Sequence, residues 1–166
     1  MPAIAKKTTS VKPTATRPHM PGYGIPETRK GLLPWSWAEQ RLKKSHNYWI
    51  STTKPDGSPH TMVVWGLWDK GAFYFSTGAK SRKARNLAKN PHCVVATDYA
   101  AEAVILEGKA SLTDDPATLK WFGRAYEKKY KWDMQNFAEP IYVVRSQVAF
   151  GLYEKRFQGS ATRWQF

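Results

Sequence analysis

The sequence predicts a mainly β protein that closes into a small antiparallel barrel. Short segments rich in aromatic and β-branched residues alternate with tight turns that contain proline and glycine. Only three helices are apparent, and these are too few to supply the crossovers of a parallel, doubly wound sheet. Closure of antiparallel strands into a small barrel accounts for the pattern better.

The N-terminal part of the chain has the composition of a flexible basic leader. Lysine and arginine are scattered there among threonine, proline and alanine, and no acidic residue precedes Glu27. Such a segment cannot bury enough apolar surface to offset the entropy lost on ordering. We therefore expect residues 1–20 to be flexible and residues 21–166 to form one domain.

The first helix is expected directly after Pro34. Ser36 and Glu39 have the spacing of a capping box, in which the serine caps the amide of Glu39 and the glutamate side chain reaches back. The helix is expected to continue to about Lys44.

A β-hairpin and a third antiparallel strand follow this helix. The segment 47–53 is aromatic and β-branched, and the turn 54–58 contains proline and glycine. The returning strand is expected at 59–68 and the third strand at 72–77.

The turn between the third strand and the second helix has the chemistry of a phosphate pocket. Thr77 and Ser81 supply hydroxyls, Gly78 lets the backbone come close, and the first amides of the helix have no intrahelical partner. Arg82 and Lys83 add two positive charges. An anion is expected here, while the residue types alone leave a solvated basic helix start equally open.

The rest of the chain alternates strands with one more helix. Ser81 is expected to cap a helix that stops at Asn90, since Pro91 disfavours helical geometry before it. Gly108 interrupts a strand and predicts a bulge or bend. Asp115 and Pro116 predict the start of the third helix. The strands expected in this part are 92–99, 103–112, 141–153 and a short segment near the C-terminus.

The net charge of +13, from 26 Lys and Arg against 13 Asp and Glu, suits an anionic partner of some kind. The basic residues are spread along the chain and many aromatic residues alternate at strand spacing, which argues against a specific nucleic-acid partner.

No apolar run is long enough to cross a bilayer. The start of the chain lacks the pattern of a secretory signal, and Cys93 is the only cysteine, so a cytoplasmic location is expected. The four histidines are isolated, which gives no support for a metal site.

Several of these segments together resemble a known family. The succession comprises Lys54–Trp65, Phe73–Thr77, Ser81–Leu87 and Asn90–Pro91. It resembles the pyridoxamine 5′-phosphate oxidase-like, FMN-binding split-barrel superfamily, and it is more closely similar to the branch that contains flavin- and deazaflavin-dependent oxidoreductases. The resemblance covers about residues 34–166.

The resemblance implies a six-stranded antiparallel split barrel with Greek-key connections. It also implies a homodimer that binds FMN, or alternatively a deazaflavin coenzyme, in each of two interface clefts. The phosphate is implied to lie at the third strand end and the Ser-Arg-Lys helix start, and the ring is implied to lie along the preceding strand. The C-terminal segment is added to this site, because alternation along a strand leaves Arg163 free to meet an anion. The predicted cofactor-binding residues are His60, Met62, Val63, Val64, Trp65, Ser76, Thr77, Ser81, Arg82, Lys83, Arg163 and Trp164.

One departure from the family pattern affects the choice of cofactor. Where the founding oxidases carry an arginine and a lysine that reach the flavin, this chain has His60 and Trp65. The loss of two fixed cations is expected to weaken FMN binding, since charge-assisted hydrogen bonds to phosphate are the strong ones. Pyridoxamine phosphate oxidation is therefore not expected.

The resemblance predicts an FMN-binding oxidoreductase that transfers hydride between a flavin or deazaflavin cofactor and a small organic substrate. No side chain is assigned a catalytic role. The alternative is a non-catalytic protein that binds or senses a flavin, a deazaflavin or haem on the same fold, because a fold by itself does not determine function.

Overall fold

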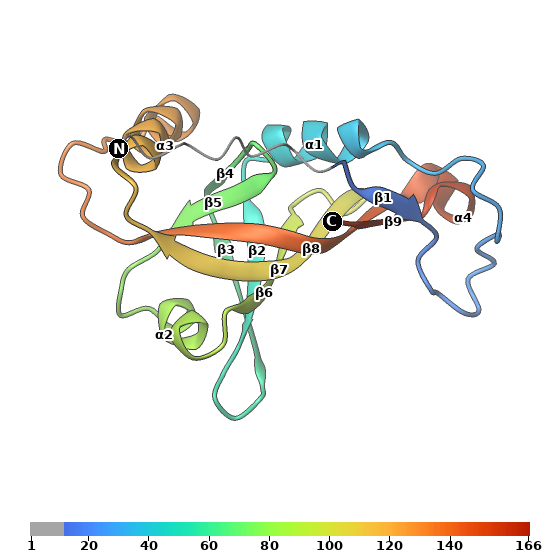
Figure 1. Cartoon of the computed structure of the whole chain (residues 1–166), viewed down its shortest axis with the longest axis horizontal. Helices are drawn as coiled ribbons and strands as arrows, with labels where there is room; N and C mark the ends of the chain where they lie inside the picture. The colour runs from blue at the N-terminus through green and yellow to red at the C-terminus, as the bar shows by residue number, and fades with distance from the viewer. Residues whose placement is uncertain (1–11) are drawn as a thin grey trace, which may run out of the picture.

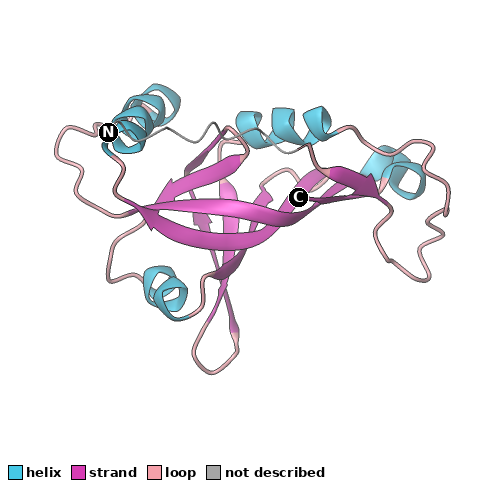
Figure 2. Ribbon diagram, viewed as in Figure 1, coloured by secondary structure: helices cyan, strands magenta, loops and turns pink. Residues whose placement is uncertain are grey.

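The computed structural model describes residues 12–166, and the strands of this part form one antiparallel sheet that curls around a hydrophobic core (Figures 1 and 2). The strands are β1 (Thr14–Thr16), β2 (Tyr48–Thr53), β3 (Pro59–Val64), β4 (Gly66–Asp69), β5 (Ala72–Ser76), β6 (His92–Thr97), β7 (Glu102–Thr113), β8 (Ile141–Tyr153) and β9 (Thr162–Gln165). The helices are α1 (Trp35–Lys44), α2 (Arg82–Lys89), α3 (Pro116–Tyr130), α4 (Phe157–Ser160) and the short 3-10 helix η1 (Glu154–Arg156). In Figure 1, α1 and α3 lie above the sheet and α2 lies below it.

The strand order confirms the predicted class, a mainly β split barrel. The main path runs β1-β9-β8-β7-β6-β2-β3, and β4 pairs with β5, which in turn pairs with β8. The strand expected at 59–68 is divided at Trp65, so that β3 pairs with β2 and β4 pairs with β5. This division and the added strands β1 and β9 explain why the described chain has nine strands rather than six.

The long strand β8 organises the barrel because its two halves have different neighbours. One edge of β8 pairs with β7 along its whole length. On the other edge, Ile141–Arg145 pair with β5 and Val148–Gly151 pair with β9. The start of α2, which follows β5, and the C-terminal strand therefore lie toward opposite ends of β8.

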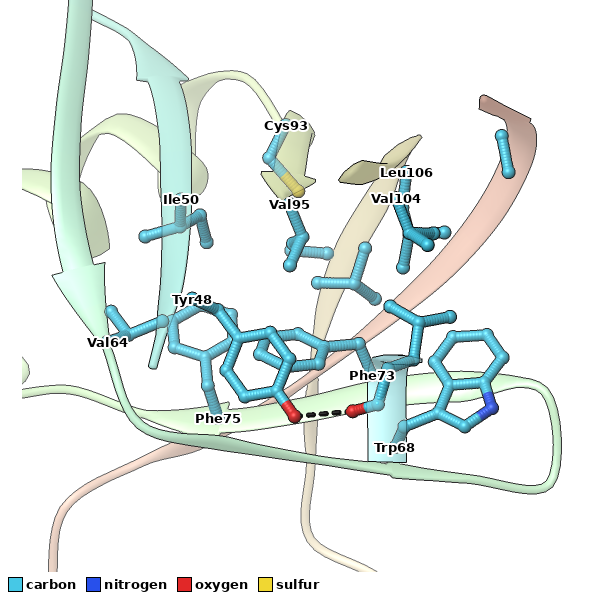
Figure 3. Close-up of a cluster of buried hydrophobic side chains, with 14 of the residues drawn as sticks. Tyr48, Ile50, Val64, Trp68, Phe73, Phe75, Cys93, Val95, Val104 and Leu106 are labelled. Atoms are coloured by element: carbon cyan, nitrogen blue, oxygen red, sulfur yellow. Dashed lines mark hydrogen bonds between the residues drawn. The ribbon is translucent and has the colours of Figure 1, made fainter. Parts of the chain in front are cut away.

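The interior of the barrel is filled by side chains. Tyr48, Phe73 and Phe75 pack against aliphatic residues of β6 and β7, and all three aromatic residues are fully buried (Figure 3). The hydroxyl of Tyr48 donates to the backbone oxygen of Leu42 in α1, the bond drawn dashed in Figure 3. Because the core is filled in this way, a ligand site is expected on the outside of the barrel.

Two glycines are required by close packing. A side chain at Gly66, next to the break at Trp65, would overlap the ring of Phe73. A side chain at Gly108 would overlap the backbone of Arg145, and the register of β7 against β8 shifts between Glu107 and Gly108. The predicted bulge at Gly108 is thus confirmed.

The helix starts match the sequence prediction at α2 and α3, and α1 begins directly after Pro34 as expected, but its predicted cap does not form. Ser81 caps α2 and Asp115 caps α3 with Pro116 in the first turn, as expected. The capping box predicted at Ser36 is wrong, because the cap position of α1 is Pro34, two residues earlier, and no side chain caps the helix. Ser36 is already inside the first turn.

The folded part of the chain begins earlier than the composition suggested. Residues 1–11 of the expected leader lie outside the described residues, but β1 pairs with β9. The Arg17 guanidinium donates to the backbone oxygens of Thr28, Lys30, Gly159 and Ala161 at 2.6–3.1 Å. A cation that composition assigns to a solvated tail therefore joins the segment before α1 to the C-terminal end of α4.

Candidate functional site

The turn between β5 and α2 brings the predicted hydroxyls together. The Thr77 and Ser81 hydroxyl oxygens lie 3.1 Å apart, and the Ser81 oxygen accepts from the amide of Ala84 at 3.2 Å. The amide of Ser81 donates to the oxygen of Gly78, which closes the turn. The Ser81 cap is uncharged, so the positive end of the helix dipole is not neutralised by its own cap.

Two cations follow directly in the first turn of α2. Arg82 is exposed and Lys83 is half-buried. Burial lowers the pKa of the Lys83 ammonium, because removal from water disfavours its charged form. Within residues 12–166 neither cation forms an ion pair. This turn therefore concentrates positive charge that an anionic ligand can neutralise.

Two contacts at this turn were not predicted from the sequence. The hydroxyl of Ser76 donates to the backbone oxygen of Pro140 at 2.8 Å, so its hydrogen is already used within the chain. The amide of Ala79 donates to the carboxylate of Glu139 at 3.0 Å. Glu139 belongs to the loop between α3 and β8 and is sixty positions from Ala79, so no local motif links the two residues.

The strand expected to meet the cofactor ring forms an open edge. β3 pairs with β2 on one side, and no strand of residues 12–166 pairs with its other side. Met62 and Val63 are 48% and 44% exposed, whereas Val64 is buried in the core. The backbone of this edge is available to hydrogen-bond a ligand. His60 lies toward the hairpin end of the strand, and its buried Nδ1 has no hydrogen-bond partner among the described residues.

Trp65 occupies the corner between β3 and β4 and is packed against α3. Its ring stacks on Tyr130 with centroids 4.6 Å apart, and Trp132 meets it edge-on at 6.0 Å. The hydroxyl of Tyr130 accepts from the amide of Gly66 and donates to a neighbouring backbone oxygen. One face of Trp65 is therefore already covered, so only the rest of its surface is open to a ligand.

A half-buried lysine supports this corner. The Lys129 ammonium donates to the Tyr48 hydroxyl at 2.9 Å and to the oxygen of Gly66 at 3.0 Å. Burial lowers the pKa of Lys129 to about 8, against a smaller opposing effect of the Asp98 carboxylate. Burial also raises the pKa of the tyrosine hydroxyls at positions 48 and 130. The lysine joins α3 to the site corner, and its spacing in the sequence gives no sign of this contact.

The predicted C-terminal site residues are not brought to the turn within one chain. Arg163 is opposite Phe150 of β8, whereas Ser76 is opposite Ile141, nine residues away along the same strand. At the rise of a strand, this is a separation of about 30 Å. Trp164 is 1% exposed and packs on Trp35, so it is a core residue of its own chain.

A large cavity lies elsewhere on the molecule. It has a volume of about 870 Å³ and lies at the β4–β5 turn, beside Trp35, Tyr74 and Trp121. It includes none of the predicted cofactor residues. In a single chain, the predicted residues form an open edge and a turn rather than an enclosed pocket.

Other kinds of site find little support in the described residues. No group of three or more metal-ligating side chains occurs in residues 12–166. Cys93 is buried, and burial raises the pKa of its thiol to about 12, which makes it unreactive. None of the helices in the described chain has both the length and the apolar character needed to cross a membrane.

Comparison with known proteins gives a consistent result. The family model described as pyridoxamine 5′-phosphate oxidase matches residues 37–150. No curated protein sequence matches the chain.

Among solved structures, general stress protein 26 from Bacillus anthracis is 16% identical with a TM-score of 0.60, over 70% of this chain and 91% of that one. A protein described as F420 reductase is 22% identical with a TM-score of 0.56, over 67% and 94%. The heme storage protein HutZ from Vibrio cholerae is 11% identical with a TM-score of 0.57, over 66% and 87%. At these identities the likeness concerns the fold.

Proposed function

The chain belongs to the pyridoxamine 5′-phosphate oxidase family, and from that premise we propose that it is an oxidoreductase that uses a flavin or deazaflavin cofactor. The observation that carries the proposal is the turn at Thr77 and Ser81. It combines two adjacent hydroxyls, an uncharged helix cap and the unpaired cations Arg82 and Lys83. This donor set has the chemistry that a phosphate group requires.

The residues present fit a cofactor of this type. Thr77, Ser81, Arg82 and Lys83 would hold the phosphate, with the amides at the start of α2 as further donors. The unpaired edge of β3 would supply backbone donors and acceptors to the polar edge of a ring system. When bound, the cofactor would supply the hydride chemistry, and the protein would supply its position and the surrounding charge.

The C-terminal residues are left out of this same-chain site. Arg163 lies along β8 from the turn, and Trp164 is buried in its own chain. In a dimer, the C-terminal segment of one copy would be able to contact the cofactor bound to the other copy.

We propose further that two copies of the chain complete the cleft. Five residues in register form an apolar row across the outer face of the sheet, namely Val63, Trp49, Ala96, Ile105 and Phe150. Trp49 is 46% exposed and Val63 is 44% exposed, which is unfavourable for such large apolar side chains in contact with water. The row ends at β3, so a second copy that covers it would lie beside the open edge.

Light scattering tests the dimer. The expected mass is about twice the chain mass of 18.9 kDa. Trp49→Asp is expected to give monomers with weakened cofactor binding, since it places a charge in the apolar row. The matched control is Leu112→Asp, which changes an equally apolar residue that is 64% exposed elsewhere on β7. A native chain that is monomeric and still binds cofactor would contradict this part of the proposal.

Turnover tests the oxidoreductase assignment. The protein is mixed with reduced FMN or reduced deazaflavin coenzyme, and menadione serves as a probe acceptor. Acceptor reduction above the rate without protein is expected, and it should be lost in the double variant Arg82→Ala with Lys83→Ala. Cofactor binding without turnover would favour the second candidate, a storage or sensing protein. The fold shared with HutZ is the observation in favour of that candidate, and an intense blue absorbance band with added haem would mark it.

A further inference from the structure

The turn proposed to bind the phosphate is contacted by a carboxylate of the protein itself. The Glu139 carboxylate accepts from the amide of Ala79 at 3.0 Å, and the same oxygen lies close to Gly78. Gly78 and Ala79 belong to the turn between Thr77 and Ser81. Glu139 therefore takes up one of the backbone donors that the turn offers and places a negative charge at the turn that leads into α2.

The position of this carboxylate is fixed from both sides of its loop. The next residue, Pro140, accepts the hydroxyl of Ser76 at 2.8 Å and leads directly into β8. Before it, Phe137 packs into the apolar cluster formed by α3, β4 and the start of β8. The loop is thus held on the barrel, and the exposed Glu139 carboxylate is held against the turn by its hydrogen bond to Ala79.

A fixed negative charge affects ligands of different charge unequally. A phosphomonoester such as the phosphate of FMN carries a charge of about −1.5 to −2 at neutral pH. A phosphodiester, such as the phosphate of a deazaflavin coenzyme, carries a single charge at that group. Repulsion from a nearby carboxylate rises in proportion to the charge of the phosphate group that it faces. The cost of displacing Glu139 from Ala79, in contrast, is common to both ligands.

We propose that Glu139 is a specificity-determining residue that disfavours phosphomonoesters and selects a cofactor with a singly charged phosphodiester. The inference rests on the proposed phosphate site and names the class of cofactor that this site takes. It agrees with the presence of His60 and Trp65 on β3, where neither residue supplies a permanent positive charge to offset a second phosphate charge.

The test compares two cofactors on three proteins by fluorescence titration. The cofactors are FMN and the deazaflavin coenzyme, and the proteins are the native chain, Glu139→Gln and the control Glu127→Gln. Glu127 is an exposed acid on α3, so the control removes the same charge at a distance from the turn. Glu139→Gln is expected to tighten FMN by about three- to tenfold and to tighten the deazaflavin coenzyme by clearly less. The control should change neither affinity.

The ratio of the two affinities separates a charge effect from a structural one. A loop that merely loosens would change both affinities together, and Glu139→Asp should keep most of the native ratio. Equal changes for both cofactors, or no change, would overturn this inference while leaving the cofactor site in place. If the native chain and all variants bind neither cofactor, the proposed function itself fails.

Discussion

The starts of α2 and α3 differ in how a side chain caps the unpaired backbone amides of the helix. In each, a side chain caps an amide three residues later, at 3.2 Å from Ser81 to Ala84 and at 2.8 Å from Asp115 to Thr118. The cap of α2 is a neutral hydroxyl, whereas the cap of α3 is a carboxylate that also accepts the Thr118 hydroxyl at 2.6 Å. The helix dipole is therefore compensated locally in α3 and remains open in α2.

The difference shows what turns a helix start into an anion site. Backbone amides without intrahelical partners occur at both helices. Only α2 adds cations in its first turn and a second hydroxyl, from Thr77, beside the cap. A carboxylate also lies near the start of α2, but it is Glu139 from a distant loop, which accepts from the amide of Ala79 before the helix and forms no ion pair with Arg82 or Lys83. An uncompensated charge, rather than the helix start alone, defines the candidate site.

The largest expected effect comes from removing the charge at α2. The double variant Arg82→Ala with Lys83→Ala is expected to weaken cofactor affinity more than tenfold, since hydrogen bonds to charged groups each contribute about 1.5–3 kcal/mol. Fluorescence titration measures the affinity. The control is Lys128→Ala with Lys131→Ala, which removes two charges at the other end of α3. Native affinity in the α2 variant would rule out the phosphate assignment.

Removing the side-chain cap of each helix in turn tests whether the two helix starts differ in function. Ser81→Ala is expected to lower the free energy of unfolding by about 1 kcal/mol and to weaken cofactor binding as well, because the same hydroxyl faces Thr77. Asp115→Ala is expected to lower the stability but to leave cofactor affinity unchanged. Urea unfolding and titration of both variants check these outcomes. Equal loss of affinity in both would mean that the two helix starts do not differ in function.

The sequence predicts those features of the fold that depend on local chemistry. The Ser81 cap, the Asp115 cap and the bulge at Gly108 each follow from the residue types within a few positions, and the structure confirms all three. The hydroxyl pair of the pocket is found in the same way, because Thr77 and Ser81 are separated by a single turn. The family resemblance placed the cofactor ring along the strand that is β3, but neither it nor a local pattern predicted that one edge of β3 is unpaired among the described residues.

The features that were missed depend on contacts between distant parts of the chain. Glu139 and Ala79 meet only because β5 and β8 pair beside them, and Lys129 reaches Gly66 only through the packing of α3. Arg17 likewise has no local partner that would reveal its four backbone contacts. For Trp164, strand alternation correctly predicted that its side chain lies on the opposite face from Arg163. It could not show that Trp164 is buried in the core of its own chain.

A smaller effect is expected in the acid range. Hydrogen bonds from the Thr118 hydroxyl, and then from its amide, lower the pKa of Asp115 in the folded state. The Asp115 carboxylate therefore contributes fully to stability above its pKa in the unfolded chain, which is about 4. This contribution is lost as the pH falls through its lower pKa in the folded chain. The difference in urea midpoint between the native chain and Asp115→Asn should shrink below pH 4. Ser81→Ala should show no such change, because a serine does not titrate there. A constant difference for Asp115→Asn would contradict this reading of the α3 cap.

We propose that the start of α2, and not that of α3, holds the phosphate of the cofactor. Amide NMR shifts during titration with FMN and with the deazaflavin coenzyme distinguish the two helix starts. We expect saturable shifts at Gly78, Ala79 and the first turn of α2, with the Ala79 amide reporting the loss of Glu139 as its partner. The amides of Asp115, Ala117 and Thr118 should not move. Saturable binding that shifts the α3 start, or that leaves residues 78–83 unchanged, would rule out a phosphate site at α2.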